Sequence, residues 1–167
     1  HLRGVIDLLS AFLGEEKLCL MMYDDPNSLT ELASHLTNLY IKTAKSGFQI
    51  RIPWHGGFVS SWGIFAPGQL LDYQVDASNM FSASDYEQSF LKFDDEIISE
   101  FAYSMVHVHA CGIHIIEPLL KIDKLKALEI SLDRETGSTD LQKILKIAEL
   151  VQKKGKALLI YGELSQD

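Results

Sequence analysis

The feature that most constrains this fold is the alternation of short buried strands with helical segments in the second half of the chain. Residues 105–111, 127–133 and 157–161 are short, largely apolar runs of the kind that form buried strands. Apolar residues at helical spacing separate them, over roughly residues 113–120 and again after a capping box at Thr139 and Gln142. Strands separated by helices pair in parallel through right-handed crossovers. The pattern therefore predicts an α/β chain built on a parallel sheet.

The first half of the chain predicts further helices and one more strand. Residues 5–22 show helical spacing on both sides of Gly14, and Asp25 with Pro26 forms a capped start for a helix that ends at Gly47. Residues 48–53 alternate and are predicted to be a strand, so we expect about four parallel strands in all. A second capping box over residues 84–87 begins a helix that continues to residue 101.

Composition narrows the class of protein and its partners. The chain has 167 residues, a formal net charge of -8 and 47% hydrophobic residues, which suits one globular domain over residues 1–167. The sequence lacks a stripe of basic residues, so we do not expect nucleic acid as a partner. Its apolar runs are too short to predict a membrane helix. Two cysteines are too few for a disulfide framework. We expect a cytoplasmic protein that acts on a small molecule.

Chemically capable side chains gather where the predicted strands end. In parallel sheets, active sites form at the carboxyl ends of the strands. Because strand side chains alternate, His107, His109 and Cys111 are predicted to share one face. His109 and Cys111 can thus converge on a zinc ion, with Asp133 at the end of the next strand as a ligand or as the residue that orients one. The alternative is a core histidine, a buried cysteine and a capping aspartate.

A long segment without helical spacing, residues 54–83, contains a second set of candidates. Loops of this length in compact domains are often functional, and aromatic rings with nearby glycines suit an organic ligand. Trp54, His55, Trp62 and Asp76 are the candidate substrate-binding residues. The alternative is an aromatic lid with no ligand.

Several motifs together resemble one enzyme family. They are Arg3-Gly4-Val5-Ile6-Asp7-Leu8-Leu9 with Gly14, Tyr23-Asp24-Asp25-Pro26, Ala66-Pro67-Gly68, residues 76–82 and His109-Ala110-Cys111-Gly112. In these motifs the chain resembles the uroporphyrinogen decarboxylase superfamily, which includes methyltransferases that move methyl groups between corrinoids and thiols such as coenzyme M. The resemblance implies part of a TIM-type (β/α) barrel. An entire barrel has about 250 residues and eight strands. We therefore expect a partial barrel that hides its open sheet by self-association or by a tightly packed rearrangement of the long segment 54–83.

The resemblance also implies a metal and a reaction. The methyltransferases bind zinc through a His-x-Cys pair, which His109 and Cys111 match, and through a second cysteine near the C-terminus, which this chain lacks. Asp133 matches an acidic zinc ligand of the more distant cobalamin-independent methionine synthase. The implied function is zinc-dependent methyl transfer to or from a thiol or corrinoid, with a corrinoid protein as a partner. The alternatives are metal-free decarboxylation of a porphyrinogen-like acid, with His55, Trp62 and Asp76 in the pocket, and a binding domain without catalysis.

Overall fold

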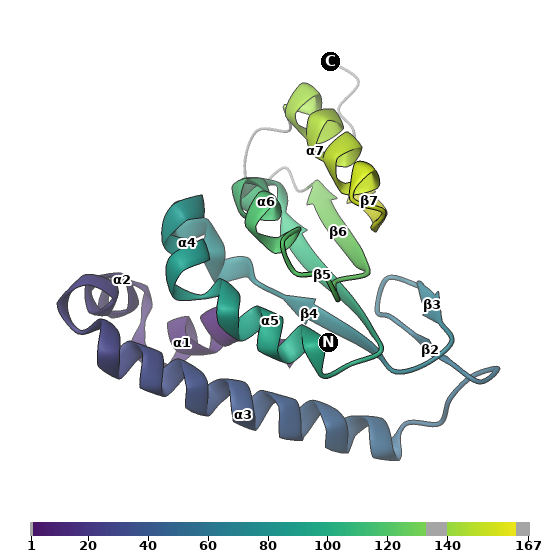
Figure 1. Cartoon of the computed structure of the whole chain (residues 1–167), viewed down its shortest axis with the longest axis horizontal. Coiled ribbons are helices and arrows are strands. Elements are labelled where there is room, and N and C mark those ends of the chain that lie inside the picture. The colour runs from purple at the N-terminus through teal and green to yellow at the C-terminus, as the bar shows by residue number, and fades with distance from the viewer. Residues whose placement is uncertain (1, 133–139, 163–167) are drawn as a thin grey trace.

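The computed structural model describes residues 2–132 and 140–162, and a parallel β-sheet lies at its centre (Figure 1). Within these ranges the sheet has five strands in the spatial order β1-β4-β5-β6-β7, and each neighbouring pair is parallel. They are β1 (Leu2–Arg3), β4 (Leu70–Gln74), β5 (Tyr103–His109), β6 (Ala127–Leu132) and β7 (Ala157–Gly162). The predicted α/β class is therefore confirmed, and the described strands form an open sheet with β1 and β7 at its edges.

Helices cover one face of this sheet. They are α1 (Val5–Leu13), α2 (Glu15–Asp24), α3 (Pro26–Ile50), α4 (Ala83–Ser89), α5 (Leu91–Ser99), η2 (Ala110–Ile115), α6 (Ile116–Leu119) and α7 (Leu141–Lys153), with the short η1 (Asp76–Met80) after β4. Their apolar side chains pack against Val106, Val108 and Ile130 of the sheet in one large core. The longest helix, α3, runs beside α5 across the molecule (Figure 1).

A small hairpin packs against the other face, near the start of the strands. Its strands β2 (Phe58–Val59) and β3 (Phe65–Ala66) are antiparallel. Leu70, Met105 and Ala127 form a second, smaller core with Trp62 and other side chains of this hairpin segment. Further along the same strands this face becomes polar, at positions that the next subsection describes. On this face, the start of the strands packs against the hairpin segment, whereas the carboxyl end carries polar side chains.

The predicted strand over residues 48–53 is wrong, because α3 continues through Gly47 to Ile50. Tyr40, Ala44 and Phe48 are all buried at a spacing of four residues, so the apolar face of the helix extends past the glycine. The helix ends before Pro53, whose ring disfavours helical geometry in the residue that precedes it. Phe48 is therefore a helical core residue.

The structure adds the strands β1 and β4, which were not predicted, and changes several element ends. Ser82, rather than Ser84, caps α4, since its hydroxyl accepts the backbone N–H of Asp85, and the helix is interrupted at Phe90 before α5 begins. Asp140 caps α7, because its side chain accepts hydrogen bonds from the backbone N–H groups of Gln142 and Lys143. Thr139 lies outside the described residues. The predicted break at Gly14 and the cap at Asp25 are confirmed.

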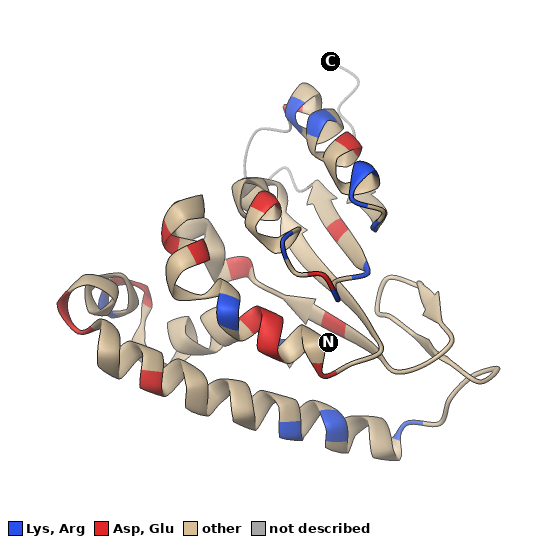
Figure 2. Cartoon of the chain, viewed as in Figure 1, with Lys and Arg blue, Asp and Glu red and all other residues tan. Residues whose placement is uncertain are grey.

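Charged residues are spread over the surface of the described helices. Figure 2 shows the lysines of α7 interleaved with an acidic residue, and Lys45 of α3 forms an ion pair with Glu100 after α5. None of the helices in the described ranges combines the length and the apolar composition needed to cross a membrane.

Candidate functional site

Two adjacent strands bring three metal-ligating side chains to the carboxyl end of the sheet. Asp76 begins η1 directly after β4, and His107 and His109 are the last inward-facing residues of β5. Because β4 and β5 are parallel with Gln74 opposite His107, the chain that leaves β4 passes beside both imidazoles. Alternation along β5 places His107 and His109 on one face, as predicted. The site is thus built from the end of β5 and the start of η1, which follows β4.

The three ligand atoms lie close to the separations found around a tetrahedral metal ion. His107 Nε2 and His109 Nε2 are 3.0 Å apart. Asp76 Oδ1 lies 3.7 Å from the first of these nitrogens and 3.6 Å from the second. Two ligands of a tetrahedral zinc ion with bonds of about 2.0–2.1 Å are about 3.3 Å apart. The geometry therefore makes Asp76, His107 and His109 a candidate metal-binding triad.

The burial and the hydrogen bonding of the triad residues also fit a bound cation. Asp76 Oδ1 is buried and has no hydrogen-bond partner, although the other oxygen of this carboxylate accepts a hydrogen bond from Gln74 Nε2. A buried carboxylate oxygen without a partner is costly unless a cation or donor faces it. The side chain of His107 is 8% exposed, whereas those of His109 and Asp76 are 27% and 36% exposed, so solvent reaches the site from the side of His109 and Asp76. Three protein ligands with an open side are typical of catalytic rather than structural zinc sites.

Glu129 on β6 holds His107 in the orientation that the triad needs. Its carboxylate contacts His107 Nδ1, and its side chain is fully buried. The register pairs these two residues directly across β5 and β6. Metal-bound histidines commonly donate their second ring N–H to a carboxylate, which fixes the tautomer and leaves the other nitrogen available to the metal. Glu129 can therefore act as a positioning residue for His107.

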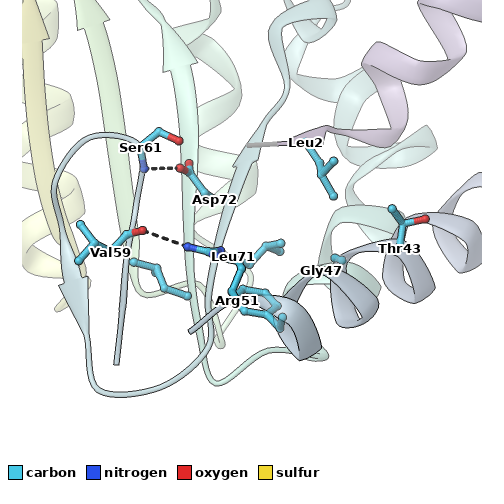
Figure 3. A pocket seen from close by; sticks show the side chains of 11 residues that line it. Leu2, Thr43, Gly47, Arg51, Val59, Ser61, Leu71 and Asp72 are labelled. Carbon is cyan, nitrogen blue, oxygen red and sulfur yellow. Dashed lines mark hydrogen bonds between the residues drawn. The ribbon is translucent and has the colours of Figure 1, made fainter. Parts of the chain in front are cut away.

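Trp62 covers the triad from the hairpin segment. Its ring stacks on the imidazole of His107, with centroids 4.8 Å apart and an interplanar angle of 15°. The loop that carries Trp62 is fixed to β4, because Ser61 N–H donates to Asp72 Oδ2 at 2.8 Å (Figure 3). Of the four predicted substrate-binding residues, Trp62 and Asp76 therefore lie at the triad.

Trp54 and His55 have other neighbours. Their ring centroids are 4.4 Å apart, and the ring of Trp54 also packs edge-on against that of Phe65. Backbone hydrogen bonds join Trp54 to Gly57 in both directions, which makes a tight turn, and the Trp54 side chain is 62% exposed. Neither residue belongs to the triad. Their predicted role in substrate binding stays a prediction.

The predicted zinc ligands are only partly brought together. His109 belongs to the triad, whereas Cys111 lies beyond the end of β5 in η2, where strand alternation no longer applies. Its Sγ atom is 3.7 Å from Asn79 Nδ2. Asp133 lies outside the described residues. The set His109, Cys111 and Asp133 therefore remains a sequence-based prediction beside the triad that the structure describes.

Sequence reasoning missed the roles of His107 and Glu129. Both are buried polar residues in largely apolar strands, and their side chains lie on the same side of the sheet. A His-x-His pair at a strand end followed by a lone acid in the next strand is a readable signal, because a buried acid needs a partner. What could not be read is the register that places Glu129 opposite His107.

A carboxylate beside the triad has an altered acidity. Asp7 of α1 is buried, and burial is the main reason that its pKa rises to about 6. The nearby charge of Asp76 raises the pKa further, while the backbone N–H of Ala77, which donates to Asp7 Oδ1 at 2.7 Å, lowers it. Asp7 and Asp76 together line an open hollow of about 280 Å³.

A separate cavity lies between α3, β4 and the hairpin segment (Figure 3). Its volume is about 390 Å³, and its lining is mainly apolar, with Arg51 and Asp72 as its charged residues. Arg51 donates to the carbonyl of Val59 and lies over the rings of Phe48 and Phe58. None of the triad residues lines this cavity.

Comparison of the chain with models of protein families, with curated proteins and with solved structures found no match.

Proposed function

We propose that this chain carries the metal centre of a (β/α)-barrel enzyme that transfers a methyl group to or from a thiol, with zinc as the metal. The single observation that supports this most directly is the convergence of Asp76, His107 and His109 at tetrahedral spacing. The location of the triad at the carboxyl ends of parallel strands agrees with where barrel enzymes carry their chemistry. A sheet whose strands follow chain order is compatible with consecutive strands of such a barrel.

The residues around the triad have separable tasks in this proposal. Glu129 keeps the Nδ1 atom of His107 protonated, so that Nε2 presents its lone pair to the metal. Trp62 shields His107 from water on one side, and the more exposed His109 leaves the opposite side open to a substrate. A bound zinc ion lowers the pKa of a thiol and holds it as the nucleophilic thiolate. Asp76 supplies the negative charge that two neutral imidazoles lack.

Metal content of the purified chain tests the proposal. After dialysis against zinc, elemental analysis is expected to give close to one zinc per chain in the wild type. His109→Ala and Asp76→Asn are expected to lower zinc affinity by at least about tenfold, because each removes one of three protein ligands. Cys19→Ser on α2 is the matched control and should leave the metal content unchanged.

The same experiment separates the two ligand sets. If the triad binds the metal, His107→Ala removes zinc and Cys111→Ser retains it. If His109, Cys111 and Asp133 bind it, Cys111→Ser removes zinc and His107→Ala retains most of it. A wild-type chain that binds no zinc, cobalt or iron would overturn the metal proposal altogether.

The alternative enzyme is a metal-free decarboxylase of a porphyrinogen-like acid. It is favoured by one observation, namely that Trp62 and Asp76, both predicted to bind such a substrate, lie together at the His107 side chain. In that case Asp76 would accept N–H groups of the substrate in place of a metal ion. A metal-free chain that binds a porphyrinogen, and loses this binding in Asp76→Asn, would favour this function over methyl transfer.

A further inference from the structure

The hollow beside the triad is lined mainly by acidic groups among its charged side chains. Of its charged side chains, Asp7, Glu15 and Asp76 are acidic, and Arg3 is the only basic one. Asp76 belongs to both the hollow and the triad, so a ligand that fills the hollow lies next to the metal site. The volume of about 280 Å³ limits this ligand to a small molecule.

Asp7 lines this hollow and, like Asp76, has a buried carboxylate oxygen without a hydrogen-bond partner. It is only 5% exposed. One of its oxygens accepts the N–H of Ala77, whereas the other, Oδ2, is buried and has no hydrogen-bond partner. A buried carboxylate oxygen without a donor costs free energy that an ammonium or N–H group of a ligand would recover. The backbone contact meanwhile fixes the orientation of the carboxylate toward η1.

The charge balance indicates the kind of donor. Two imidazoles and Asp76 around a divalent ion carry a net positive charge, which suits a thiolate. Asp7 and Glu15 are then the other acidic residues that line the hollow, together with the exposed Arg3. An anionic group at Asp7 would face an unscreened carboxylate, and a neutral group would leave Asp7 Oδ2 without a charge-assisted hydrogen bond.

We infer that the hollow selects small thiols that carry an ammonium group, with Asp7 as the residue that recognises the ammonium. This inference rests on the proposed function, because it assumes that the triad holds the metal to which the thiol binds. The sulfur would lie toward Asp76, which the hollow shares with the triad, and the nitrogen toward the Asp7 carboxylate.

The test uses the cobalt-loaded chain and three thiols of similar size. Cysteamine carries an ammonium group, mercaptoethanol a hydroxyl and mercaptoacetate a carboxylate. Binding of each thiol is followed by the thiolate-to-cobalt charge-transfer absorption. These thiols differ in their own acidity, so the quantity compared is the ratio of affinities between wild type and variant for each thiol. In Asp7→Asn we expect the affinity for cysteamine to fall about tenfold, as for loss of one charge-assisted hydrogen bond, and that for mercaptoethanol to change less than about twofold.

Two further variants keep the test decisive. Ser10→Lys adds a cation to the wall of the same hollow, one helical turn from Asp7 on α1, and it should weaken cysteamine binding and strengthen mercaptoacetate binding. Glu96→Gln on the exposed face of α5 is the matched control, with no expected change. Equal changes for all three thiols in both hollow variants would overturn the inference while the metal site stands. A wild-type chain that takes up no cobalt would overturn the proposed function and the inference together.

Discussion

Glu129 is a fully buried acid whose one assigned partner is an imidazole. Glu129→Gln keeps the size of the side chain and an oxygen that can accept from His107 Nδ1, but it removes the charge. Loss of such a supporting carboxylate is expected to weaken zinc binding by about 10- to 100-fold. The measurement is competition for zinc against a chelator of known affinity, on protein whose thermal unfolding shows that it is folded.

The exposed Glu117 of α6 provides the control, since Glu117→Gln also removes one acidic group but contacts none of the triad residues. Equal zinc affinity in Glu129→Gln and the wild type would show that Glu129 serves the core alone.

Asp94 on α5 makes the stability of the fold depend on pH, because it is a buried acid that contacts two tyrosines. The hydroxyls of Tyr73 and Tyr86 donate to its two oxygens. Burial raises the pKa of Asp94 from 3.8 to about 7, against the lowering effect of these hydroxyls. The protonated carboxyl is therefore favoured in the folded state. Its contribution to stability is complete below about pH 4 and is lost as the pH rises through about 7.

Asp94→Asn should therefore flatten the pH dependence of stability. In urea unfolding between pH 4 and 8 we expect the free energy of unfolding of the wild type to fall by a few kcal/mol, and that of Asp94→Asn to fall less. Asp95→Asn, one residue along on the exposed side of the same helix, is the control and should keep the wild-type slope. A wild-type stability that rises over this range would contradict the assignment.

At the scale of elements, replacing either of two glycines in the helical region by alanine is expected to change the stability of the chain in opposite directions. Gly47 lies inside α3, and a Cβ atom there would meet no atom within 4 Å. Gly14 separates α1 from α2 with φ of 81°, a conformation that disfavours side chains. Gly47→Ala is expected to stabilise the chain by about 0.5–1 kcal/mol and Gly14→Ala to destabilise it by about 1 kcal/mol. Urea unfolding of both variants measures this, and destabilisation by Gly47→Ala would show that α3 ends earlier.

Three of the strands could be predicted from the sequence because they are short, largely apolar runs that alternate with helical segments. The segments predicted at 105–111, 127–133 and 157–161 correspond to β5, β6 and β7 with shifts of at most two residues at the ends. β4 was missed because Asp72 and Gln74 face the hairpin side, although Leu71, Tyr73 and Val75 alternate toward the helices in a readable way. β1 has two residues, too few for any periodicity. The strand predicted at 48–53 failed because a glycine need not end a helix whose apolar face continues.

The candidate site could be predicted only in part from the sequence. Residue types at strand ends pointed to His109 and to a metal, since local alternation decides which side chains share a face. The choice of partners depends on the spacing between different strands, which one sequence does not reveal. Asp76 is separated by 31 positions from His107 and reaches it only because β4 and β5 pair in this register.

At the scale of the whole molecule, the edge strand β7 predicts self-association. It carries no charged residue over Ala157–Gly162, and Tyr161 is 62% exposed on it. Unprotected apolar edges pair with other chains unless a charge blocks them. Sedimentation is expected to show a dimer or larger species, and Tyr161→Lys should shift it toward the monomer. Tyr23→Lys, at another largely exposed tyrosine, on α2, should have no effect. A wild-type chain that sediments as a monomer would contradict this prediction.

The stacking of Trp62 on His107 gives the site its own optical signal. The chain has two tryptophans, and the other one, Trp54, lies in the separate turn with Gly57. Indole emission is sensitive to charge and to electron acceptors in van der Waals contact with the ring, and His107 is such a neighbour. In a Trp54→Phe background, all tryptophan fluorescence comes from the ring that touches the triad. Any ion or proton that arrives at His107 then changes the brightness of the protein itself, without an added dye or label.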